Sequence, residues 1–316
     1  MTIKQSNPLV SIIVITYNSA KFVLETLESV KAQTYQNIEL IVSDDCSTDN
    51  TVEICRKWIE ENKTRFVRNK LITVEKNTGI PANCNRGVRD AQGEWVKFIA
   101  GDDILMSNSI LDNILQSKKL LKQYGVIYSK FTAFEITENG KKIVKVDIPK
   151  SICNNNCSPQ SRYELALRCM GPSIQTMFFH CSVLMLNGGF DEEFKLLEDW
   201  PLYLRLTRAS VPFIYLPIET IEYRIHNSST FNNDRKIAIY SDWWVTNWAP
   251  VYRKYVRPNV GHFENFLVSY KICIITLFLK SKLNHFNFIN RLINYILCLP
   301  YEIYRRNVIR RIYSNN

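Results

Sequence analysis

Pairs of adjacent acidic residues recur along the chain, each near the end or start of a predicted regular element. The three pairs are Asp44-Asp45, Asp102-Asp103 and Glu198-Asp199. Neighbouring carboxylates repel one another, so gathering them is costly unless a positive charge is bound among them. Carboxylate oxygens suit Mg²⁺ or Mn²⁺, which proteins usually hold together with phosphate oxygens of a substrate. The pairs therefore indicate a metal-assisted reaction on a phosphate-bearing substrate.

Each pair also has a simpler interpretation as a helix-terminal charge. Asp44-Asp45 and Asp102-Asp103 could cap the helices that follow them, and Glu198-Asp199 could match the dipole at a helix start. A cap needs one acid, whereas each of these positions carries two. The doubling favours a shared site over three unrelated caps.

The elements that position the acids alternate between apolar β-branched runs and amphipathic stretches, which is typical of a parallel sheet covered by helices. We expect strands at 9–15, 38–42, 71–74, 95–99, 126–134, 213–216 and 218–224. We expect helices from 19 or 20, from 49 or 50, and at 81–91, 109–124 and 197–208. Ligands of open parallel sheets bind beyond the carboxyl ends of the strands, where the first two acidic pairs fall.

Polar residues without a clear pattern fill 135–161, which we interpret as a hairpin or a variable loop. The nine cysteines are odd in number and scattered, and the first residues lack the features of a secretory signal. We therefore expect a cytosolic protein. Cys153 and Cys157 form the one close pair, and without a second pair nearby we expect no zinc site.

The formal net charge of +10 is concentrated at the C-terminal end. From Pro250 to Asn316 there are eleven Lys or Arg against Glu264 and Glu302, which gives this tail +9 and leaves +1 for the rest. Apolar residues fill 266–279, a stretch shorter than the ~20 residues of a spanning helix. Aromatic residues mixed with arginines follow, as in helices that lie in the headgroup layer of a membrane. The alternative is a helical cap on the catalytic domain with a solvated basic face. No nucleic-acid-binding motif accompanies the charge, so we expect no nucleic-acid partner.

Eight motifs occur in an order that is similar to that of a known family. They occupy residues 10–18, 39–49, 77–79, 85–87, 93–103, 188–192, 198–200 and 223–226. This set resembles the family 2 glycosyltransferases, which are inverting enzymes with a GT-A fold that use nucleotide-sugar donors. The resemblance covers roughly the first 230 residues.

The resemblance implies an α/β GT-A fold, with a Rossmann-like, mostly parallel central sheet flanked by helices and a C-terminal helical extension. The catalytic domain would span 1–235, with a nucleotide-sugar half at about 1–105 and an acceptor half at about 106–235. Residues 236–316 would form a basic, aromatic helical tail at the inner face of the cytoplasmic membrane. The implied reaction transfers a sugar from a nucleotide-diphosphate sugar, by analogy a UDP-sugar, to a glycan or lipid-linked glycan in bacterial O-antigen or capsule synthesis. Mn²⁺ or Mg²⁺ is the implied cofactor.

Site residues on the donor side follow from the same resemblance. Thr16 and Tyr17 would line the nucleotide pocket, with Tyr17 against the uracil or ribose. Asp45 would accept a hydrogen bond from the base ring N–H. Asn85 belongs to a motif that contacts the donor, although the arginine that usually precedes it is Cys84 here.

The metal motif of the family corresponds to Asp102 and Asp103, with Ala100 in place of the usual first acid. Either aspartate could hold the metal while the other holds the ribose. His226 resembles a histidine that joins the metal in some members, and a strand-end surface histidine is the alternative.

Asp199 resembles the catalytic base, which an inverting displacement needs to take the proton from the acceptor hydroxyl. Glu198 would orient the acceptor or cap the helix. Two other functions remain open. A nucleotidyltransferase would need a Gly-rich basic loop after the first strand, where this chain has Thr16 to Ser19. A non-catalytic, membrane-associated partner of a polysaccharide assembly complex is favoured only by Ala100.

Overall fold

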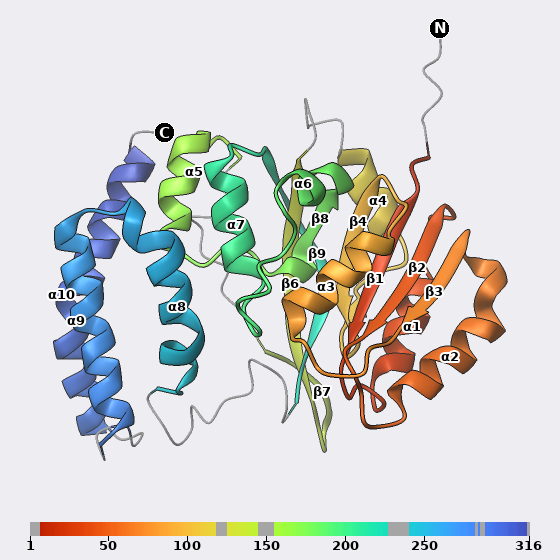
Figure 1. The fold of residues 1–316 in the computed structure, drawn as a ribbon, viewed down its shortest axis with the longest axis horizontal. Coiled ribbons are helices and arrows are strands. Elements are labelled where there is room, and N and C mark those ends of the chain that lie inside the picture. Colours follow the sequence, from red (N-terminus) through yellow and green to blue (C-terminus); the bar gives the residue numbers. More distant parts are fainter. Residues whose placement is uncertain are drawn as a thin grey trace, which may run out of the picture.

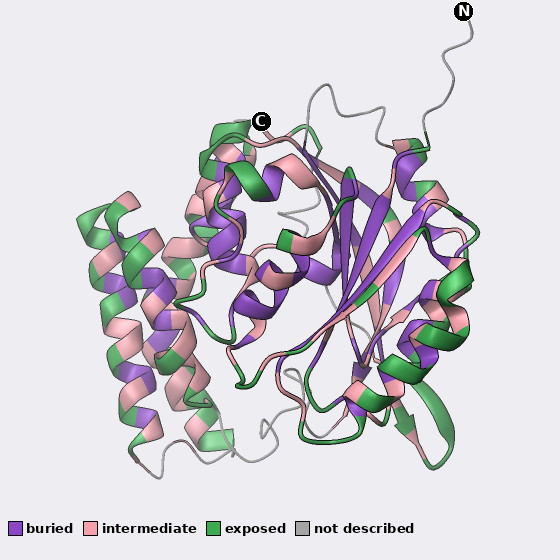
Figure 2. Ribbon diagram, turned by 45° about the vertical axis from the view of Figure 1, so that its right-hand side comes forward, coloured by how far each residue is buried: buried purple, intermediate pink, exposed green. Residues whose placement is uncertain are grey.

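The strands of the first half are buried on both faces, as their unbroken apolar sequences predict. Successive residues of β1 (Val10–Thr16) enter opposite cores: Ile13 joins one hydrophobic cluster, and Ile12 and Val14 join the other. Figure 2 shows these central strands as buried and places the exposed residues on the outer sides of the covering helices. The sheet therefore separates two cores.

The computed structural model describes residues 7–117, 125–144, 155–226, 240–281, 284 and 288–314. Within them, one sheet has the strand order β3-β2-β1-β4-β8-β6-β9-β5, and β7 pairs with β6 (Figure 1). The remaining strands are β2 (Ile38–Asp44), β3 (Arg68–Ile72), β4 (Trp95–Ala100), β5 (Ile104–Leu105), β6 (Val126–Thr137), β7 (Gly140–Val144), β8 (Met177–His180) and β9 (Phe213–Ile225).

Parallel pairing of β1 with β2 and β4 brings three strand ends together. Thr16 lies opposite Asp44, and Ile15 lies opposite Ala100. The expected meeting of the first two acidic pairs at one edge is thus confirmed at the level of the backbone. The edge strand β3 lies at Arg68–Ile72 and not at the expected 71–74, because its ladder with β2 runs from Arg68 opposite Glu39 to Ile72 opposite Ser43.

The second half of the sheet departs from a mostly parallel arrangement. β8 pairs antiparallel with both β4 and β6, and β5 pairs antiparallel with β9, so the sheet as a whole is mixed. β9 is one strand where two were expected. Its register against β6 shifts between Tyr215 and Glu219, and Pro217, which has no N–H for the ladder, lies inside that irregularity.

Helices cover both faces of the sheet (Figure 1). They are α1 (Val23–Lys31), α2 (Thr51–Asn62), α3 (Ile80–Asp90), α4 (Ile110–Ser117), α5 (Pro159–Ala166), α6 (Cys181–Leu186) and α7 (Asp199–Arg208). The helix expected to reach residue 124 is described as far as Ser117. The 135–161 stretch contains the β6–β7 hairpin and the start of α5, while 145–154, including Cys153, lie outside the described residues.

A helical region follows the sheet and lies at the edge of the molecule opposite β3 (Figure 1). It comprises π-helical turns around α8 (Ala249–Val251), then α9 (His262–Leu279) packed against α10 (Phe288–Ser314). Among the described helices, α9 is long and apolar enough to cross a membrane by length and composition, and one third of it is buried in the protein. The boundary expected at 235 falls outside the described residues, and the division near 105 stays a prediction.

Candidate active site

The ends of β1 and β2 are joined by hydrogen bonds from Thr16 and the turn after β2. The Thr16 hydroxyl donates to Asp44 Oδ2 at 2.7 Å, and the Ser47 backbone N–H and hydroxyl donate to the same carboxylate at 2.8 and 2.5 Å. Asp44 is therefore occupied by internal donors. Tyr17, which directly follows β1, is 51% exposed and lies at the surface of this edge.

Asp45 organises the turn that precedes α3. Its carboxylate accepts from the Thr78 N–H (2.9 Å) and hydroxyl (2.6 Å), the Gly79 N–H (2.7 Å) and the Arg86 guanidinium (2.6 Å). Burial alone would raise the pKa of Asp45, but these hydrogen bonds outweigh it and lower the pKa below its usual value. Asp45 is thus ionised, buried and fully bonded.

Helix α3 links the Asp45 turn to the segment that leads into α7. Gly79 has φ +93°, and a Cβ there would lie 2.8 Å from the Lys195 carbonyl, which accepts from the Ile80 N–H. The Asn85 amide is bonded to the same segment: it accepts from the Phe190 N–H at 2.8 Å and donates to the Phe190 carbonyl at 2.9 Å. The side-chain amide of Asn85 therefore packs against this segment and is hydrogen-bonded to it.

The second acidic loop lies directly against the end of β1. A Cβ on Gly101 would lie 2.7 Å from Thr16 Cγ2, so only glycine permits this approach. The two aspartates that follow point in different directions. Asp102 is partly exposed, and its Oδ2 is 2.9 Å from His226 Nε2. Asp103 is buried, and its Oδ1 accepts from the Arg224 N–H at 2.8 Å.

Asp103 Oδ2 is buried without a hydrogen-bond partner among the described residues. Burial and the neighbouring charge of Asp102 raise the pKa of Asp103 well above its usual value. The two aspartates therefore differ in exposure: Asp102 is partly exposed beside His226, and Asp103 is buried.

Arg224 is a residue of this site that sequence reasoning quoted within a motif but gave no role. Its guanidinium is buried, donates to the Asp102 carbonyl at 2.9 Å and pairs with Glu25 at 2.6 Å. It lies 4.7 Å from the centre of the Phe22 ring, which in turn packs 4.9 Å from the His226 ring. Strand alternation places Arg224 and His226 two residues apart on one face, which is the signal that could have identified it.

Glu198 and Asp199 stand at the start of α7. Asp199 Oδ1 accepts from the Trp200 N–H at 2.6 Å, and no ion pair compensates either carboxylate within the described part of the chain. Burial, followed by the charge of Asp199, raises the pKa of Glu198 to about 8. Burial raises that of Asp199 to about 6, against the lowering effect of the Trp200 hydrogen bond. The two carboxyl groups therefore titrate as a pair, at pH values above the usual range of carboxylic acids.

The acidic pair lies close to α3, because the charge of Glu198 acts on the buried Cys84 thiol of that helix and helps to raise its pKa. Together with the Lys195 and Phe190 contacts, this places the start of α7 over the helix whose own start is held by Asp45. The first and third acidic pairs are thus connected through α3, whereas the Asp102-Asp103 pair adjoins the end of β1 through Gly101.

No group of three or more His, Cys, Asp or Glu side chains that could hold a metal ion occurs in the described ranges. Asp102 and His226 provide two converging ligand atoms on partly exposed side chains. Such a pair fits a divalent cation that takes its remaining ligands from substrate phosphates and water, as Mg²⁺ commonly does. The donor set is compatible with a metal bound together with a nucleotide diphosphate.

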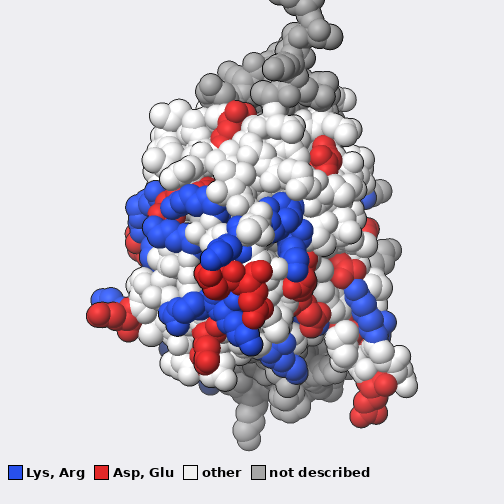
Figure 3. All heavy atoms as spheres, turned by 90° about the vertical axis from the view of Figure 1, so that its right-hand side faces the viewer, with Lys and Arg blue, Asp and Glu red and all other residues white. Residues whose placement is uncertain are grey.

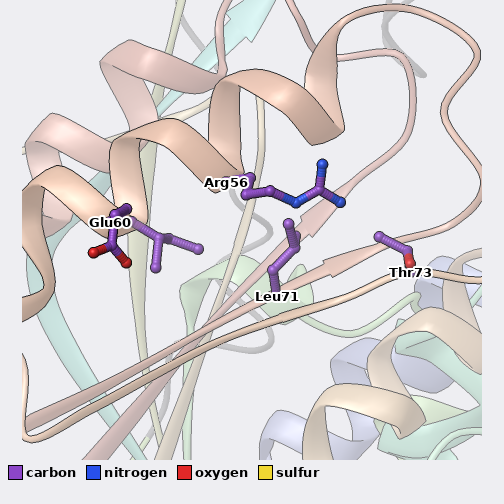
Figure 4. A pocket seen from close by; sticks show the side chains of 5 residues that line it. Arg56, Glu60, Leu71 and Thr73 are labelled. Atoms are coloured by element: carbon purple, nitrogen blue, oxygen red, sulfur yellow. The ribbon is translucent and has the colours of Figure 1, made fainter.

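A separate cavity of about 450 Å³ lies between α2 and the edge strand β3, away from the acidic pairs. Figure 4 shows its lining side chains, which are Arg56, Ile59, Glu60, Leu71 and Thr73. Figure 3 shows interspersed basic and acidic groups on the face of the molecule at the β3 edge. Lys70 of β3 forms an ion pair with Asp90. This mixture agrees with the near-neutral charge of the chain before the tail, and nothing there matches the chemistry of the acidic loops.

Comparisons with known proteins point in one direction. The family model of glycosyl transferase family 2 matches residues 11–183. An uncharacterized glycosyltransferase of Rickettsia prowazekii is 28% identical over 246 residues, which are 75% of this chain and 71% of that protein. WfaP of Escherichia coli, a UDP-Glc:alpha-D-GlcNAc-diphosphoundecaprenol beta-1,3-glucosyltransferase, is 33% identical over 237 residues, 73% of this chain and 83% of WfaP.

Solved structures with a similar fold include S. aureus TarS 1-349 in complex with UDP-GlcNAc, with a TM-score of 0.55 and 23% identity over 70% of this chain and 60% of that one. The mannosyltransferase PcManGT of Pyrobaculum calidifontis, in complex with GDP-Man and Mn²⁺, has a TM-score of 0.52 and 20% identity over 70% and 58% of the two chains. This chain thus spans less than two thirds of the solved chains. At these identities the likeness establishes the fold, which is of the GT-A type as expected.

Proposed function

Because the chain belongs to glycosyl transferase family 2, we propose that this glycosyltransferase inverts the anomeric centre of a UDP-sugar as it moves the sugar to a glycan on a lipid diphosphate. The observation that carries the proposal is the junction built on α3. This helix holds Asp45 at its start and the loop before Asp199 along its length, and the Asp102 loop closes against β1 beside it. A donor bound at the strand ends would therefore meet both the metal-ligand pair and the acid pair.

The nucleotide would lie against the ends of β1 and β2. Tyr17 is the exposed ring at that edge and is suited to stack on uracil. Thr16 and Asp45 have their polar atoms engaged within the protein, so Asp45 can accept the base N–H only if it releases one of its four donors. We therefore propose that Thr16 and Asp45 shape the pocket through these internal hydrogen bonds. Asn85 supports the pocket from below through its bonds to Phe190.

Asp102 and His226 would hold the divalent cation with the donor diphosphate. A cation there would offset the negative charge that develops on the departing nucleotide. Asp103 keeps its place in the interior, where it accepts from the Arg224 N–H and fixes the strand end that carries His226. In this assignment Asp102 is the metal ligand and Asp103 positions it.

Asp199 would act as the base. A direct displacement needs a carboxylate on the face opposite the leaving group to take the proton of the acceptor hydroxyl. With a pKa raised toward neutrality, Asp199 is ionised at pH 7 yet basic enough to hold a proton in the transition state. Glu198 is protonated under the same conditions and can donate a hydrogen bond to the acceptor.

The acceptor class follows from relatives and from the tail. WfaP acts on a sugar diphosphate attached to undecaprenol. This chain carries a +9 tail that could approach an anionic membrane surface. We therefore place the enzyme at the cytoplasmic face of the inner membrane, in surface-polysaccharide synthesis of the O-antigen or capsule type. The family match leaves the nucleotidyltransferase alternative without support.

A thermal-shift screen against UDP, GDP, dTDP and CMP, each with and without Mn²⁺, tests the donor side. We expect stabilisation by UDP with Mn²⁺ that is lost with EDTA and in Asp102→Asn. Transfer from UDP-sugars to a short-chain lipid-diphosphate sugar, followed by mass spectrometry, tests the reaction. Folded protein that binds no nucleotide under any condition would contradict the proposal, and nucleotide binding without any transfer would favour the non-catalytic partner.

A further inference from the structure

The two C-terminal helices leave large apolar side chains in solvent. On α9 the exposed residues recur every three or four positions on one face, which is the spacing of an apolar stripe. They are Phe263, Phe266, Cys273 and Leu277, with the exposed Ser269 between Phe266 and Cys273. On the first turns of α10 the exposed apolar residues are Phe288, Ile289, Leu292, Tyr295, Ile296 and Ile303. Large apolar groups gathered in this way on one element usually mark an interaction site.

The helix pair is held to the catalytic domain through its opposite sides. Glu264 on α9 is buried and pairs with Arg168 at 2.7 Å, and the Tyr304 hydroxyl of α10 donates to the same carboxylate at 3.2 Å. Lys271 on α9 pairs with Glu302 on α10 at 2.8 Å. The apolar stripes are therefore not the faces by which the helices pack on the protein. Figure 2 shows the exposed residues of this pair on its outer surfaces.

The charge of residues 250–316 indicates which kind of partner binds the exposed helix faces. Glu264 and Glu302 are the two acidic residues between 250 and 316, and both are consumed by the internal ion pairs just described. The last turns of α10 expose Arg306, Arg310 and Arg311, which follow the apolar turns on the same helix. None of these three arginines forms an ion pair within the described ranges. An apolar stripe that runs into such exposed arginines is complementary to an anionic bilayer surface.

The length of α9 is just sufficient to cross a membrane, but its anchoring argues against a transmembrane arrangement. Its 18 residues would span about 27 Å, close to the thickness of a bilayer core of about 30 Å. Its inner side contains the buried Glu264 that binds Arg168 of the catalytic domain. Insertion across a membrane would require breaking that ion pair and exposing both charges to lipid.

We propose that the exposed faces of α9 and α10, the docking face, bind the surface of an anionic bilayer without spanning it, with the apolar side chains in the headgroup layer and the arginines on the lipid phosphates. The role of this binding, which is to bring the active site to a lipid-linked acceptor, rests on the proposed function. The binding itself is independent of catalysis, so it can be measured without donor or acceptor.

Vesicle flotation of the full chain tests the docking face. We expect binding to phosphatidylglycerol-containing vesicles, much weaker binding to pure phosphatidylcholine, and release at 1 M salt, where the Debye length falls to about 3 Å. Phe288→Glu should weaken binding about tenfold, which corresponds to about 1.4 kcal/mol. Leu186→Glu on α6 is the matched control, since Leu186 is 83% and Phe288 81% exposed, and it should bind as wild type does.

A second variant, Arg310→Glu with Arg311→Glu, should reduce binding to anionic vesicles and leave the weak binding to neutral ones unchanged. Equal effects of Phe288→Glu and Leu186→Glu, or equal binding to both kinds of vesicle, would overturn the proposal. A stable dimer in light scattering that Phe288→Glu dissociates would assign the face to a second copy instead. Transfer to a water-soluble acceptor should survive in all these variants, so loss of docking and loss of catalysis are distinguishable.

Discussion

The acid limb of the pH–rate profile should reveal whether Asp199 is the base. Burial raises the pKa of Asp199 to about 6, whereas an unperturbed aspartate has a pKa of about 3.9. Only the ionised form can take the acceptor proton. With a pKa of about 6, roughly one molecule in eleven is ionised at pH 5, so the rate should fall about tenfold from its plateau. An ordinary aspartate would lose less than about a tenth of its activity at that pH.

The assay is kcat/KM for the acceptor at saturating donor and Mn²⁺, between pH 5 and pH 8.5, because this quantity reports the ionisation of the enzyme before the acceptor binds. Glu198→Gln is the matched control, since it keeps the shape of the neighbouring side chain and removes its titration. The variant should retain an acid limb near pH 6. Asp199→Asn should lower kcat by about 10² to 10⁴-fold while donor binding persists.

Two results would refute the assignment. A profile that stays flat down to pH 5 would mean that no carboxyl group with a raised pKa carries the rate. An acid limb near pH 8 that disappears in Glu198→Gln would identify Glu198 as the base and leave Asp199 as a helix-terminal charge that accepts from the Trp200 N–H.

Three further outcomes follow from the geometry. Both members of the Glu198-Asp199 pair have raised pKa values in the folded protein, so the free energy of unfolding should fall as pH rises from about 5 to 8, by at most about 1.4 kcal/mol per pH unit for each proton. Glu198→Gln should therefore flatten the fall in Tm between pH 6 and 8. An unchanged slope of Tm against pH would contradict this prediction. Asp102→Asn should weaken Mn²⁺-dependent UDP binding at least about tenfold, measured by titration calorimetry, with little change in Tm. Asp103→Ala should instead lower the free energy of unfolding by about 1–3 kcal/mol, measured by urea unfolding, because it leaves the Arg224 N–H unpaired. The reverse pattern would exchange the roles of the two aspartates. Asp45→Ala removes the buried partner of Arg86 and should therefore destabilise the protein by about 3–5 kcal/mol, measured by urea unfolding. A loss of UDP affinity at unchanged stability would indicate instead that Asp45 contacts the uracil directly.

Much of the fold could be predicted from local sequence. Strands such as β1 are unbroken β-branched runs, and residues of this type in this length have few alternatives to a strand buried on both faces. The antiparallel half could not be predicted in the same way, because strand order depends on which edges meet after the chain has turned. β9 was predicted as two strands because Pro217 reads as a break, whereas the structure accommodates it as an irregularity in a continuous ladder.

The position of the acidic residues relative to the strands could be predicted, whereas the directions of their side chains could not. The acids could be placed at strand ends, since that follows from where apolar runs stop. Which carboxylate faces inward depends on partners far along the chain: Asp103 meets the Arg224 N–H, and Asp45 meets Arg86. Arg224 itself had no local signal beyond its alternation with His226, because its partners Asp102 and Glu25 lie on other elements.

The repulsion argument for a bound cation holds for some of the acids and not for others. At Asp44-Asp45 the repulsion is offset by internal donors, which include Thr16, Ser47, Thr78 and Arg86, so no cation is needed there. Two acidic pairs are less compensated within the described residues. They are Asp102-Asp103, where Asp103 Oδ2 lacks a hydrogen-bond partner in that part of the chain, and the Glu198-Asp199 pair at the start of α7, which forms no ion pair there. These are the two places where the proposed reaction develops or moves charge: the diphosphate departs at the first, and the acceptor proton arrives at the second. We infer that the fully hydrogen-bonded carboxylates stabilise the structure of this site, while the less compensated ones take part in the reaction. Asp45→Ala should therefore lower stability, and Asp102→Asn should lower nucleotide binding.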